Sequence, residues 1–338
     1  MSRPISLLAL LCGVGIFVLL ISLAQTDLTG VPADSSSSDL RQSVSHTSVL
    51  AKQQNDKRQL LAFIGVQTGF TISTEAKYNY KARRAALRAT WFPDSQEGLD
   101  RLERDTNMLI RFIIGRTSND TKEAELMTES NEHGGFLRLD LEEQYNSLTN
   151  KTVAFLQLVT SIYEPQYIVK ADDDVYLRVD RIPYAVKQWS TFQSDYIGCM
   201  KTGRIMTSPE WRWYEPQHAV LGGGEYFTHA WGSIYVLSGN AALRVAQMPT
   251  GSLRFFANED VTLGSWMLAF NVRHFDDRRL CDAWCTSSSL AVYNIPECSG
   301  LCNPVEDLVH LHAQSDCVSP ALTDGSVPLL PPIFRFNQ

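Results

Sequence analysis

Short apolar runs alternate with amphipathic stretches through the middle of the chain. The runs Leu60–Val66, Met108–Ile114 and Tyr167–Ala171 are almost wholly apolar and are bounded by glycine or polar residues, which predicts buried strands. Lys77–Thr90 and Leu148–Tyr163 predict helices, and the apolar residues of the second lie near one helical face. Because strands and helices alternate, the pattern predicts an α/β domain with a mostly parallel central sheet covered by helices.

The pattern continues toward the C-terminus. Ser233–Leu237 and Leu308–His312 are typical of strands, whereas Val261–Phe270 is typical of a helix. We expect one domain over residues 59–317, because a single α/β domain of that length is common. Residues 318–338 are rich in proline and predict an irregular tail.

The N-terminus predicts a single transmembrane helix. Ile5–Ala24 is an apolar stretch without a charged residue, long enough to cross a hydrocarbon core of about 30 Å. Arg3 precedes it, so we expect residues 1–4 to form a cytoplasmic tail and the rest of the chain to be lumenal, a type II arrangement. A cleaved signal peptide ending at Ala24 is the alternative. Residues 25–58 are poor in large apolar groups and predict a flexible stem.

Charge and cysteine usage narrow the class of protein. The chain of 338 residues has a formal net charge of −7, which gives no electrostatic footprint for nucleic acid binding. Cys12 lies in the predicted anchor, and the even number of cysteines that remains predicts disulfides in an oxidising lumen. A zinc site built from two closely spaced pairs is the alternative. The six cysteines are Cys199, Cys281, Cys285, Cys298, Cys302 and Cys317, and the zinc candidates are Cys281 with Cys285 and Cys298 with Cys302.

Three consecutive aspartates follow the apolar run that ends at Ala171. Carboxylates at contact distance raise one another's pKa, so we expect a cation beside Asp172, Asp173 and Asp174 unless they form a solvated surface turn. Oxygen ligands on one short turn suit Mg²⁺ or Mn²⁺, and such an ion can hold a diphosphate. The position also fits, because ligands of open α/β sheets bind beyond the carboxyl ends of the strands.

Three further clusters are candidates for chemistry. Arg84 and Arg88 share a face of one predicted helix. The alternatives for their two guanidinium groups are binding to a diphosphate, pairing with an acidic partner and exposure to solvent. Asp260, at the start of another predicted helix, is either a helix cap or a general base toward a substrate hydroxyl. His310 and His312 lie on one face of the predicted strand, where one imidazole completes a Mn²⁺ site or both are packed and hydrogen-bonded.

Taken in order, these segments resemble glycosyltransferase family 31, the inverting β-1,3-galactosyl- and N-acetylglucosaminyltransferases of the Golgi, over about residues 60–317. The motifs that carry the resemblance are Arg83–Trp91 (RRxxIRxTW in the family), Phe112–Gly115 (FxxG), Tyr145–Thr152 (YxNLTxKT), Lys170–Asp174 (KxDDD) and Ala257–Val261 (NEDV). Similarity to the plant-type branch lies in Tyr226–Ala230, Ile234–Ser238, Asp276–Cys281 and Cys298–Cys302. Many animal members have YPPYCSGGGY where this chain has Trp213–Tyr226, so animal relatives do not indicate its acceptor.

The resemblance implies a GT-A-like nucleotide-sugar-binding domain at the Golgi membrane. It implies transfer of galactose from UDP-galactose, with inversion, to a hydroxyl of a glycan or glycoprotein acceptor in a β-1,3 linkage, with Mn²⁺ as the cofactor. Transfer of N-acetylglucosamine, or of galactose to hydroxyproline, is the alternative within this class. A catalytically silent Golgi chaperone on the same fold is the alternative outside it.

The resemblance also implies roles for individual residues. Asp260 is the expected catalytic base. Asp174 and His312, with His310 as the alternative, are the expected metal ligands. The expected contacts to the nucleotide sugar are Arg83, Arg84, Arg88, Lys151, Asp172 and Asp173.

Overall fold

The computed structural model describes residues 57–75, 78–144, 148–295 and 297–320. The predicted cytoplasmic tail, transmembrane helix and nearly all of the predicted stem lie outside these ranges, as does most of the predicted C-terminal tail. In the ranges described, no helix combines the length and the apolar character needed to cross a bilayer.

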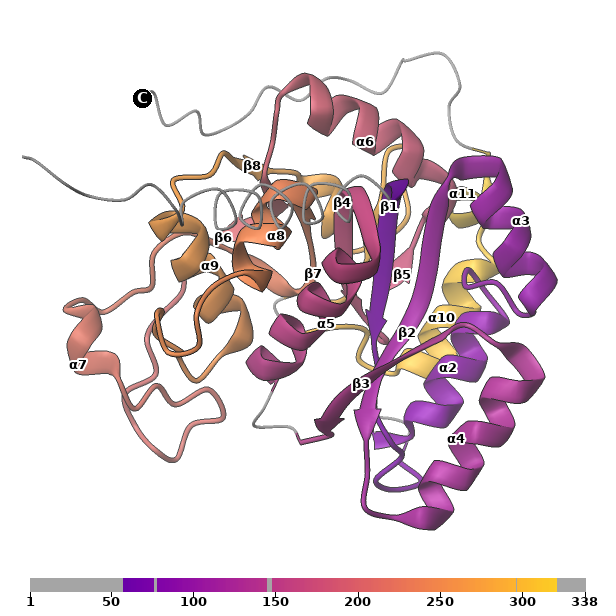
Figure 1. The fold of residues 1–338 in the computed structure, drawn as a ribbon, viewed down its shortest axis with the longest axis horizontal. Coiled ribbons are helices and arrows are strands. Elements are labelled where there is room, and N and C mark those ends of the chain that lie inside the picture. The colour runs from indigo at the N-terminus through magenta and orange to yellow at the C-terminus, as the bar shows by residue number, and fades with distance from the viewer. Residues whose placement is uncertain (1–56, 76–77, 145–147, 296, 321–338) are drawn as a thin grey trace, which may run out of the picture. The chain divides into compact units, whose positions relative to one another are not determined.

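Within the described residues, seven strands form one sheet in the order β3-β2-β1-β4-β7-β6-β8 (Figure 1). The first four are parallel neighbours, β7 is antiparallel to both β4 and β6, and β8 is parallel to β6. This confirms the predicted α/β domain with a mostly parallel sheet. The strands are β1 (Arg58–Gln67), β2 (Met108–Arg116), β3 (Phe136–Glu142), β4 (Tyr163–Asp172), β6 (Tyr196–Lys201), β7 (His229–Ser238) and β8 (His274–Asp276), and a small second sheet pairs β5 (Tyr176–Leu177) with β9 (Ala291–Val292).

Helices cover both faces of the sheet. Successive side chains of a strand point to opposite faces, so Ile64 of β1 packs into one apolar core and Phe63 into the other. The first core receives side chains from α2 (Tyr80–Arg88), α3 (Gln96–Thr106), α6 (Ile182–Thr191) and α10 (Pro304–His312). The second receives them from α5 (Leu148–Ile162), α8 (Gly239–Ala246) and α9 (Glu259–Ala269). The remaining helical segments are α4 (Asp120–His133), α7 (His218–Leu221), α11 (Ser315–Val318), η3 (Val179–Arg181) and η4 (Arg278–Leu280).

The segment around the two histidines is a helix, so the predicted strand over Leu308–His312 is wrong. Pro304 occupies the first turn of α10 and acidic residues follow it there, which are both helix-start signals. Leu308 and Leu311 are buried, a spacing of three that suits a helix rather than a strand. His310 and His312 therefore do not share a face, because residues two apart on a helix point in nearly opposite directions.

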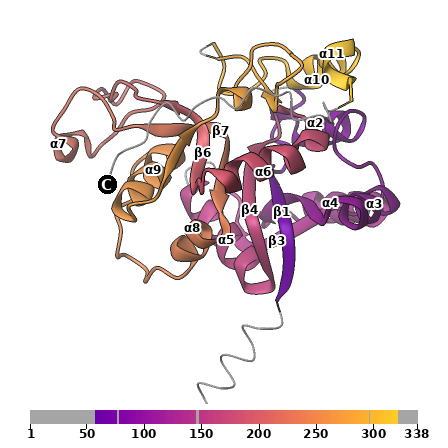
Figure 2. The same cartoon turned by 90° about the horizontal axis from the view of Figure 1, so that it is seen from above.

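Three disulfides join the six cysteines of the predicted lumenal part. The pairs are Cys199–Cys281, Cys285–Cys317 and Cys298–Cys302. The prediction of disulfides is therefore confirmed, and the zinc alternative is wrong because all of its sulfur ligands are bonded to sulfur. The Cys199–Cys281 and Cys285–Cys317 links tie the C-terminal segment to the domain, where α10 packs against α2 (Figure 2), and Cys298–Cys302 closes a short local loop.

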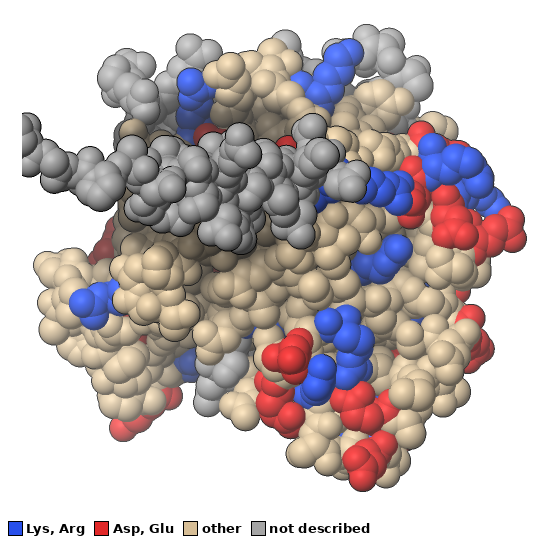
Figure 3. Space-filling view, in the orientation of Figure 1, with Lys and Arg blue, Asp and Glu red and all other residues tan. Residues whose placement is uncertain are grey.

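Charged side chains are mixed in sign on the side of the molecule formed by α3 and α4. On the face that Figure 3 shows, Lys and Arg there alternate with Asp and Glu. Several of these are ion pairs, such as Arg101 with Glu97 and Arg138 with Glu123. The charge on this side is therefore locally balanced.

Candidate active site

The three aspartates form a turn that leaves β4 at the carboxyl edge of the sheet. The last residues of β1 and β4 pair in parallel register, so this aspartate turn, Asp172–Asp174, lies beside Thr68. The Thr68 hydroxyl donates to Asp173 Oδ2 at 2.7 Å, and Arg83 of α2 donates to Asp173 Oδ1 at 2.7 Å. Asp173 is only 2% exposed, whereas Asp172 and Asp174 are half-buried, so the turn is a charge-paired feature at the edge of the core rather than a solvated surface loop.

Asp172 is paired with a lysine of its own strand. Lys170 Nζ lies 2.5 Å from Asp172 Oδ1 and also donates to the main-chain carbonyl of Gly232 on β7. Burial disfavours the ammonium charge, but Asp172, together with Glu259 and Asp260, more than offsets this and raises the pKa of Lys170 above its ordinary value. The lysine therefore remains charged and fixes both the aspartate and the adjacent strand.

Asp174 has a buried oxygen without a partner. Its Oδ2 lies 3.3 Å from Arg83 Nη1, while its Oδ1 accepts no hydrogen bond from the part of the chain that the structure describes. Burial, together with the negative charge of Asp172, raises the pKa of Asp174 to about 7. The Gly300 backbone packs against this carboxylate, since a Cβ there would lie 2.2 Å from Asp174 Oδ1.

The donor chemistry of the turn fits a divalent cation. An unpartnered carboxylate oxygen beside further carboxylates suits Mg²⁺ or Mn²⁺. Among the described residues, no group of three or more His, Cys, Asp and Glu side chains is arranged to hold a metal alone. Such ions are often held by one or two carboxylates together with substrate phosphates, so Asp174 suits a cation that arrives with a diphosphate.

The two histidines of α10 lie in different surroundings. A hydrogen bond of 2.9 Å joins His312 Nδ1 to the hydroxyl of Tyr176, which follows Asp174 by two residues. His310 is exposed. The structure thus turns His312, and not His310, toward the strand that continues the aspartate turn.

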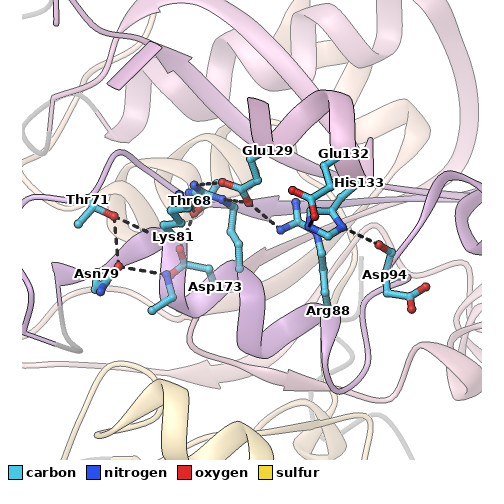
Figure 4. Close-up of polar contacts among 12 residues, drawn as sticks. Thr68, Thr71, Asn79, Lys81, Arg88, Asp94, Glu129, Glu132, His133 and Asp173 are labelled. Carbon is cyan, nitrogen blue, oxygen red and sulfur yellow. Dashed lines mark hydrogen bonds and ion pairs between the residues drawn. The ribbon is translucent and has the colours of Figure 1, made fainter. Parts of the chain in front are cut away.

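Arg84 and Arg88 face an acidic partner, one of the alternatives that the sequence left open. Glu129 of α4 accepts from Arg84 Nη2 at 2.6 Å and from Arg88 Nη1 at 2.6 Å, and all three side chains are buried (Figure 4). Burial alone would raise the pKa of Glu129, but the hydrogen bonds and charges of the two arginines hold it below its ordinary value. The structure therefore separates these two guanidinium groups from Arg83, which reaches the aspartate turn.

Lys151 and Arg84 both secure the end of β1. Lys151 Nζ donates to the main-chain carbonyl of Thr68 at 2.5 Å and pairs with Glu143 at 2.5 Å. Arg84 Nη1 donates to Thr68 Oγ1 at 3.2 Å and to the carbonyl of Gly69 at 2.8 Å. Burial lowers the pKa of Lys151. Both residues thus position Thr68, the hydroxyl that holds Asp173.

Asp260 lies in the first turn of α9, between a lysine and a histidine. Its Oδ2 is 3.0 Å from Lys201 Nζ and 3.7 Å from His229 Nε2, and its Oδ1 accepts from the N–H of Val261 at 2.9 Å. Burial disfavours the charge, but Lys201 and then His229 hold the pKa of Asp260 below its ordinary value. The neighbouring Glu259 is half-buried and accepts from Thr152 and Tyr235, so it has a structural role.

Gly232 connects Asp260 to the aspartate turn. The Lys170 that pairs with Asp172 also holds the Gly232 carbonyl, and a Cβ on Gly232 would lie 3.4 Å from Asp260 Cβ. The structure therefore brings the carboxyl edge of the sheet and the start of α9 to one place. This is the arrangement that the chemistry of a metal, a diphosphate and a base requires.

Sequence reasoning missed four residues that shape the site: Thr68, Glu129, Lys201 and His229. Thr68 and Glu129 carry no local signal, since each acts on residues far away in the chain. Lys201 and His229 end and begin two antiparallel strands, β6 and β7, and face each other across that pair. Only knowledge of the strand pairing would have indicated them.

Residues 82–278 match the family model described as galactosyltransferase. This range begins in α2 and includes Arg83, the aspartate turn and Asp260. This chain belongs to the galactosyltransferase family. It is therefore a glycosyltransferase, and the resemblance to family 31 is confirmed.

Plant proteins are among its curated relatives. A probable beta-1,3-galactosyltransferase 12 of Arabidopsis thaliana is 46% identical over 82% of this chain and 70% of the relative. A probable beta-1,3-galactosyltransferase 13 of the same plant is 43% identical over 77% of this chain and 74% of the relative. Among solved structures, TarS of S. aureus overlaps with a TM-score of 0.31 and 11% identity over 60% of this chain and 53% of that chain, too small a likeness to define a fold.

Proposed function

We propose that this galactosyltransferase family member transfers galactose from UDP-galactose to a hydroxyl of a glycan or glycoprotein, with inversion and a β-1,3 linkage, on a GT-A-like domain that uses Mn²⁺. Family membership and the names of the plant relatives support the sugar and the linkage. The observation that carries the proposal is the contact of the aspartate turn with Asp260 through Gly232. A displacement at the anomeric carbon requires the diphosphate site and the base to lie close to one another.

The aspartate turn supplies the donor side of the proposed reaction. Bound Mn²⁺ would neutralise the charge that develops on the leaving diphosphate. Asp174 would hold it through Oδ1, with His312 as the proposed second ligand. Arg83 and Lys170 keep the other carboxylates of the turn in place, because each forms an ion pair there.

Asp260 is the proposed base toward the acceptor hydroxyl. Lys201 keeps its carboxylate ionised and therefore ready to accept a proton. The contact with the Val261 N–H uses only Oδ1, so the capping interpretation and the base interpretation are compatible. Inversion follows when this base and the diphosphate lie on opposite sides of the anomeric carbon.

Arg84, Arg88 and Lys151 are proposed to support the nucleotide pocket indirectly. Their charged groups are already paired with Glu129 or Glu143 in buried surroundings. They fix α2 and the end of β1, from which Arg83 and Thr68 reach the aspartate turn. Their effect on the donor is therefore one of positioning.

The segment between β6 and β7 is the proposed acceptor side. It carries two half-exposed indole rings, Trp211 at 42% and Trp213 at 45% exposed. The wholly buried Glu215 anchors the segment, because its Oε2 accepts from the N–H of Ala257, three residues before Asp260. Sugar rings have apolar C–H faces that stack on aromatic rings, and aromatic side chains commonly line ligand sites. This supports a glycan acceptor.

We propose a Golgi location with the domain in the lumen. The three disulfides of the described part support an oxidising compartment. The predicted N-terminal anchor would give a single-pass type II topology at the Golgi membrane.

A donor screen of the full-length chain tests the proposal. We expect transfer from UDP-galactose to a galactan acceptor with Mn²⁺ and loss of transfer in excess chelator. Asp174→Asn is expected to abolish metal-dependent transfer, and Asp260→Asn to lower it by about 10²-fold or more while donor binding survives. Asp140→Asn is the matched control, because its side chain is 86% exposed on β3.

The same screen separates the alternatives. A preference for UDP-N-acetylglucosamine, or for a hydroxyproline peptide as the acceptor, would replace the proposed specificity by the corresponding alternative. Wild-type rates in Asp174→Asn, or full activity with chelator, would refute the metal site. No transfer with any donor and acceptor would favour the silent chaperone.

A further inference from the structure

A buried histidine faces the proposed base. His229, the first residue of β7, is 1% exposed, and its Nε2 lies 3.7 Å from Asp260 Oδ2. The other ring nitrogen, Nδ1, lies 2.8 Å from the main-chain oxygen of Phe227. A carbonyl oxygen can only accept, so Nδ1 carries the hydrogen of this bond. In the neutral ring Nε2 is then an acceptor aimed at a carboxylate, with no hydrogen between the two atoms.

Close packing of α9 on β7 creates this juxtaposition. Gly264 lies one turn after Asp260 on the same helical face. A Cβ at Gly264 would lie 2.5 Å from His229 Cβ, so only glycine lets the helix approach the strand here. The arrangement of α9 beside β7 is visible in Figure 1. A side chain at this helix position would push the histidine away from the carboxylate.

The surroundings keep the imidazole neutral before reaction. The charged and titratable groups that face its ring are Asp260 of α9, Lys201 of β6 and the phenol of Tyr226. Burial is the strongest influence and, with the positive charge of Lys201, outweighs Asp260, so the pKa of His229 lies below its ordinary value. At neutral pH two acceptors therefore face one another across a gap that a single proton would fill.

We propose that His229 is a positioning residue for Asp260 and shares the proton that Asp260 takes from the acceptor hydroxyl. This inference rests on the proposed function. The acceptor oxygen bonds to the anomeric carbon while the bond from that carbon to the diphosphate breaks, and the diphosphate leaves with the electron pair. The hydroxyl proton passes to Asp260 Oδ2, which then donates to His229 Nε2. Proton transfer to Nε2 leaves an imidazolium paired with a carboxylate, and the proton is released to solvent before the next cycle.

The first test compares His229→Gln and His229→Phe with wild type in the full-length chain. We expect transfer to fall by about 10- to 100-fold, as is typical when a partner of a reacting group is removed, with little change in the KM for the donor. The pH profile is the decisive reading. In wild type the rate should fall as pH decreases through the pKa of His229, because an imidazolium cannot accept the proton. In both variants this acid limb should be absent until Asp260 itself is protonated.

His274→Gln is the matched control. Its Nδ1 lies 3.0 Å from the Val272 carbonyl in the same manner, and burial lowers its pKa against the charge of Asp195. Its ring packs on Tyr196, and among the described ion pairs it has none of the kind that joins His229 to Asp260. We expect the transfer rate and the pH profile of His274→Gln to match those of wild type. A loss equal to that of His229→Gln would mean that general packing, and not the proton, explains the effect.

A second measurement does not depend on sugar-transfer activity. Nuclear magnetic resonance of ¹³C-histidine-labelled protein follows the titration of His229 in wild type and in Asp260→Asn. Removing the carboxylate charge should lower the pKa of His229 by about one unit or more. An unchanged pKa would overturn the inference, even if the His229 variants failed to fold.

The two proposals fail separately. If Asp260→Asn transfers at the wild-type rate, Asp260 is not the base and the proposed function is wrong in that respect. If Asp260→Asn is inactive while His229→Gln and His229→Phe keep the wild-type rate and pH profile, only the role of His229 is refuted.

Discussion

The N–H of Leu301 donates a hydrogen bond of 2.7 Å to the carbonyl oxygen of Asp174. Leu301 belongs to the short loop that the Cys298–Cys302 disulfide closes. Gly300 of the same loop packs against the Asp174 carboxylate. The loop therefore fixes both the backbone and the side chain of the proposed metal ligand.

Gly300→Ala should disturb that ligand directly. The added Cβ would lie 2.2 Å from Asp174 Oδ1, so the carboxylate or the loop must move. We expect the Mn²⁺ concentration for half-maximal transfer to rise about 10-fold or more, in line with losses at ligand-supporting positions. Gly203→Ala is the control, because a Cβ there would have nothing within 4 Å. Equal Mn²⁺ dependence in the two variants would contradict the expected role of the loop.

Glu129→Gln should destabilise the domain strongly. It removes the negative charge that pairs with both Arg84 and Arg88 and leaves two buried guanidinium groups without that partner. We expect a loss of about 3–5 kcal/mol in the free energy of unfolding, measured by denaturant titration with the disulfides intact. Glu97→Gln breaks an exposed ion pair with Arg101 and should change the free energy of unfolding by about 0.5 kcal/mol or less.

The cost of Glu129→Gln should depend on pH. The folded-state pKa of Glu129 is depressed, so its contribution is fully present above the unfolded-state pKa of about 4.3 and is lost as pH falls through the folded-state value. The difference in unfolding free energy between wild type and Glu129→Gln should therefore shrink in acid. A difference that stays constant from neutral pH into acid would show that charge is not the cause.

His312→Ala should weaken Mn²⁺ binding if this histidine is the second ligand. Its ring is oriented by the Tyr176 hydroxyl, so Tyr176→Phe should have a smaller effect in the same direction. His310→Ala should leave Mn²⁺ dependence unchanged, because that ring is exposed on another side of α10. The measurement is a Mn²⁺ titration of transfer. The reverse ranking would reassign the ligand, and no effect from either would remove histidine from the site.

The central strands of the sheet were predictable because they are buried on both faces, whereas the largely exposed β3, together with β6 and β8, was not predicted. Leu60–Val66 and Tyr167–Ala171 are apolar at nearly every position, which is the pattern of a central parallel strand. The aspartates that follow Ala171 were therefore placed correctly at the carboxyl edge. The strand predicted over Leu308–His312 was wrong because five residues are too few to distinguish a period of two from the period of a helix. Pro304, a helix-start residue, was the better signal.

The partners of charged residues were not predictable. Arg84 and Arg88 are a basic pair in the sequence, but Glu129 is 45 and 41 residues away, and only the packing of α4 on α2 brings it between them. Likewise His229 meets Asp260 because β7 runs antiparallel beside β4 and α9 returns onto it. Local patterns indicate which groups carry charge, whereas the topology decides which charges meet.

Trp213→Ala and Trp211→Ala should weaken acceptor binding. Loss of one stacking ring is expected to cost about 0.5–1.5 kcal/mol, a rise of about two- to tenfold in the KM for the acceptor. Hydrolysis of the donor without acceptor should be unchanged, since the aspartate turn is untouched. Trp284→Ala is the control, because that ring is 68% exposed but lies next to Cys285 on another segment. An equal effect in all three variants would argue against the proposed acceptor side.

The packing of α10 on α2 has a consequence for how the chain is made. The first helix of the domain stays uncovered until one of the last has been synthesised, and Cys199 must wait for Cys281, 82 residues later. At about 5–20 residues per second, that interval alone lasts about 4–16 s. The helix α2 therefore emerges from the ribosome with an apolar surface exposed, and Cys199 follows as a free thiol. Folding of this enzyme is expected to depend on chaperones and disulfide isomerases that act on the growing chain, because α2 cannot complete its packing until α10 has been synthesised.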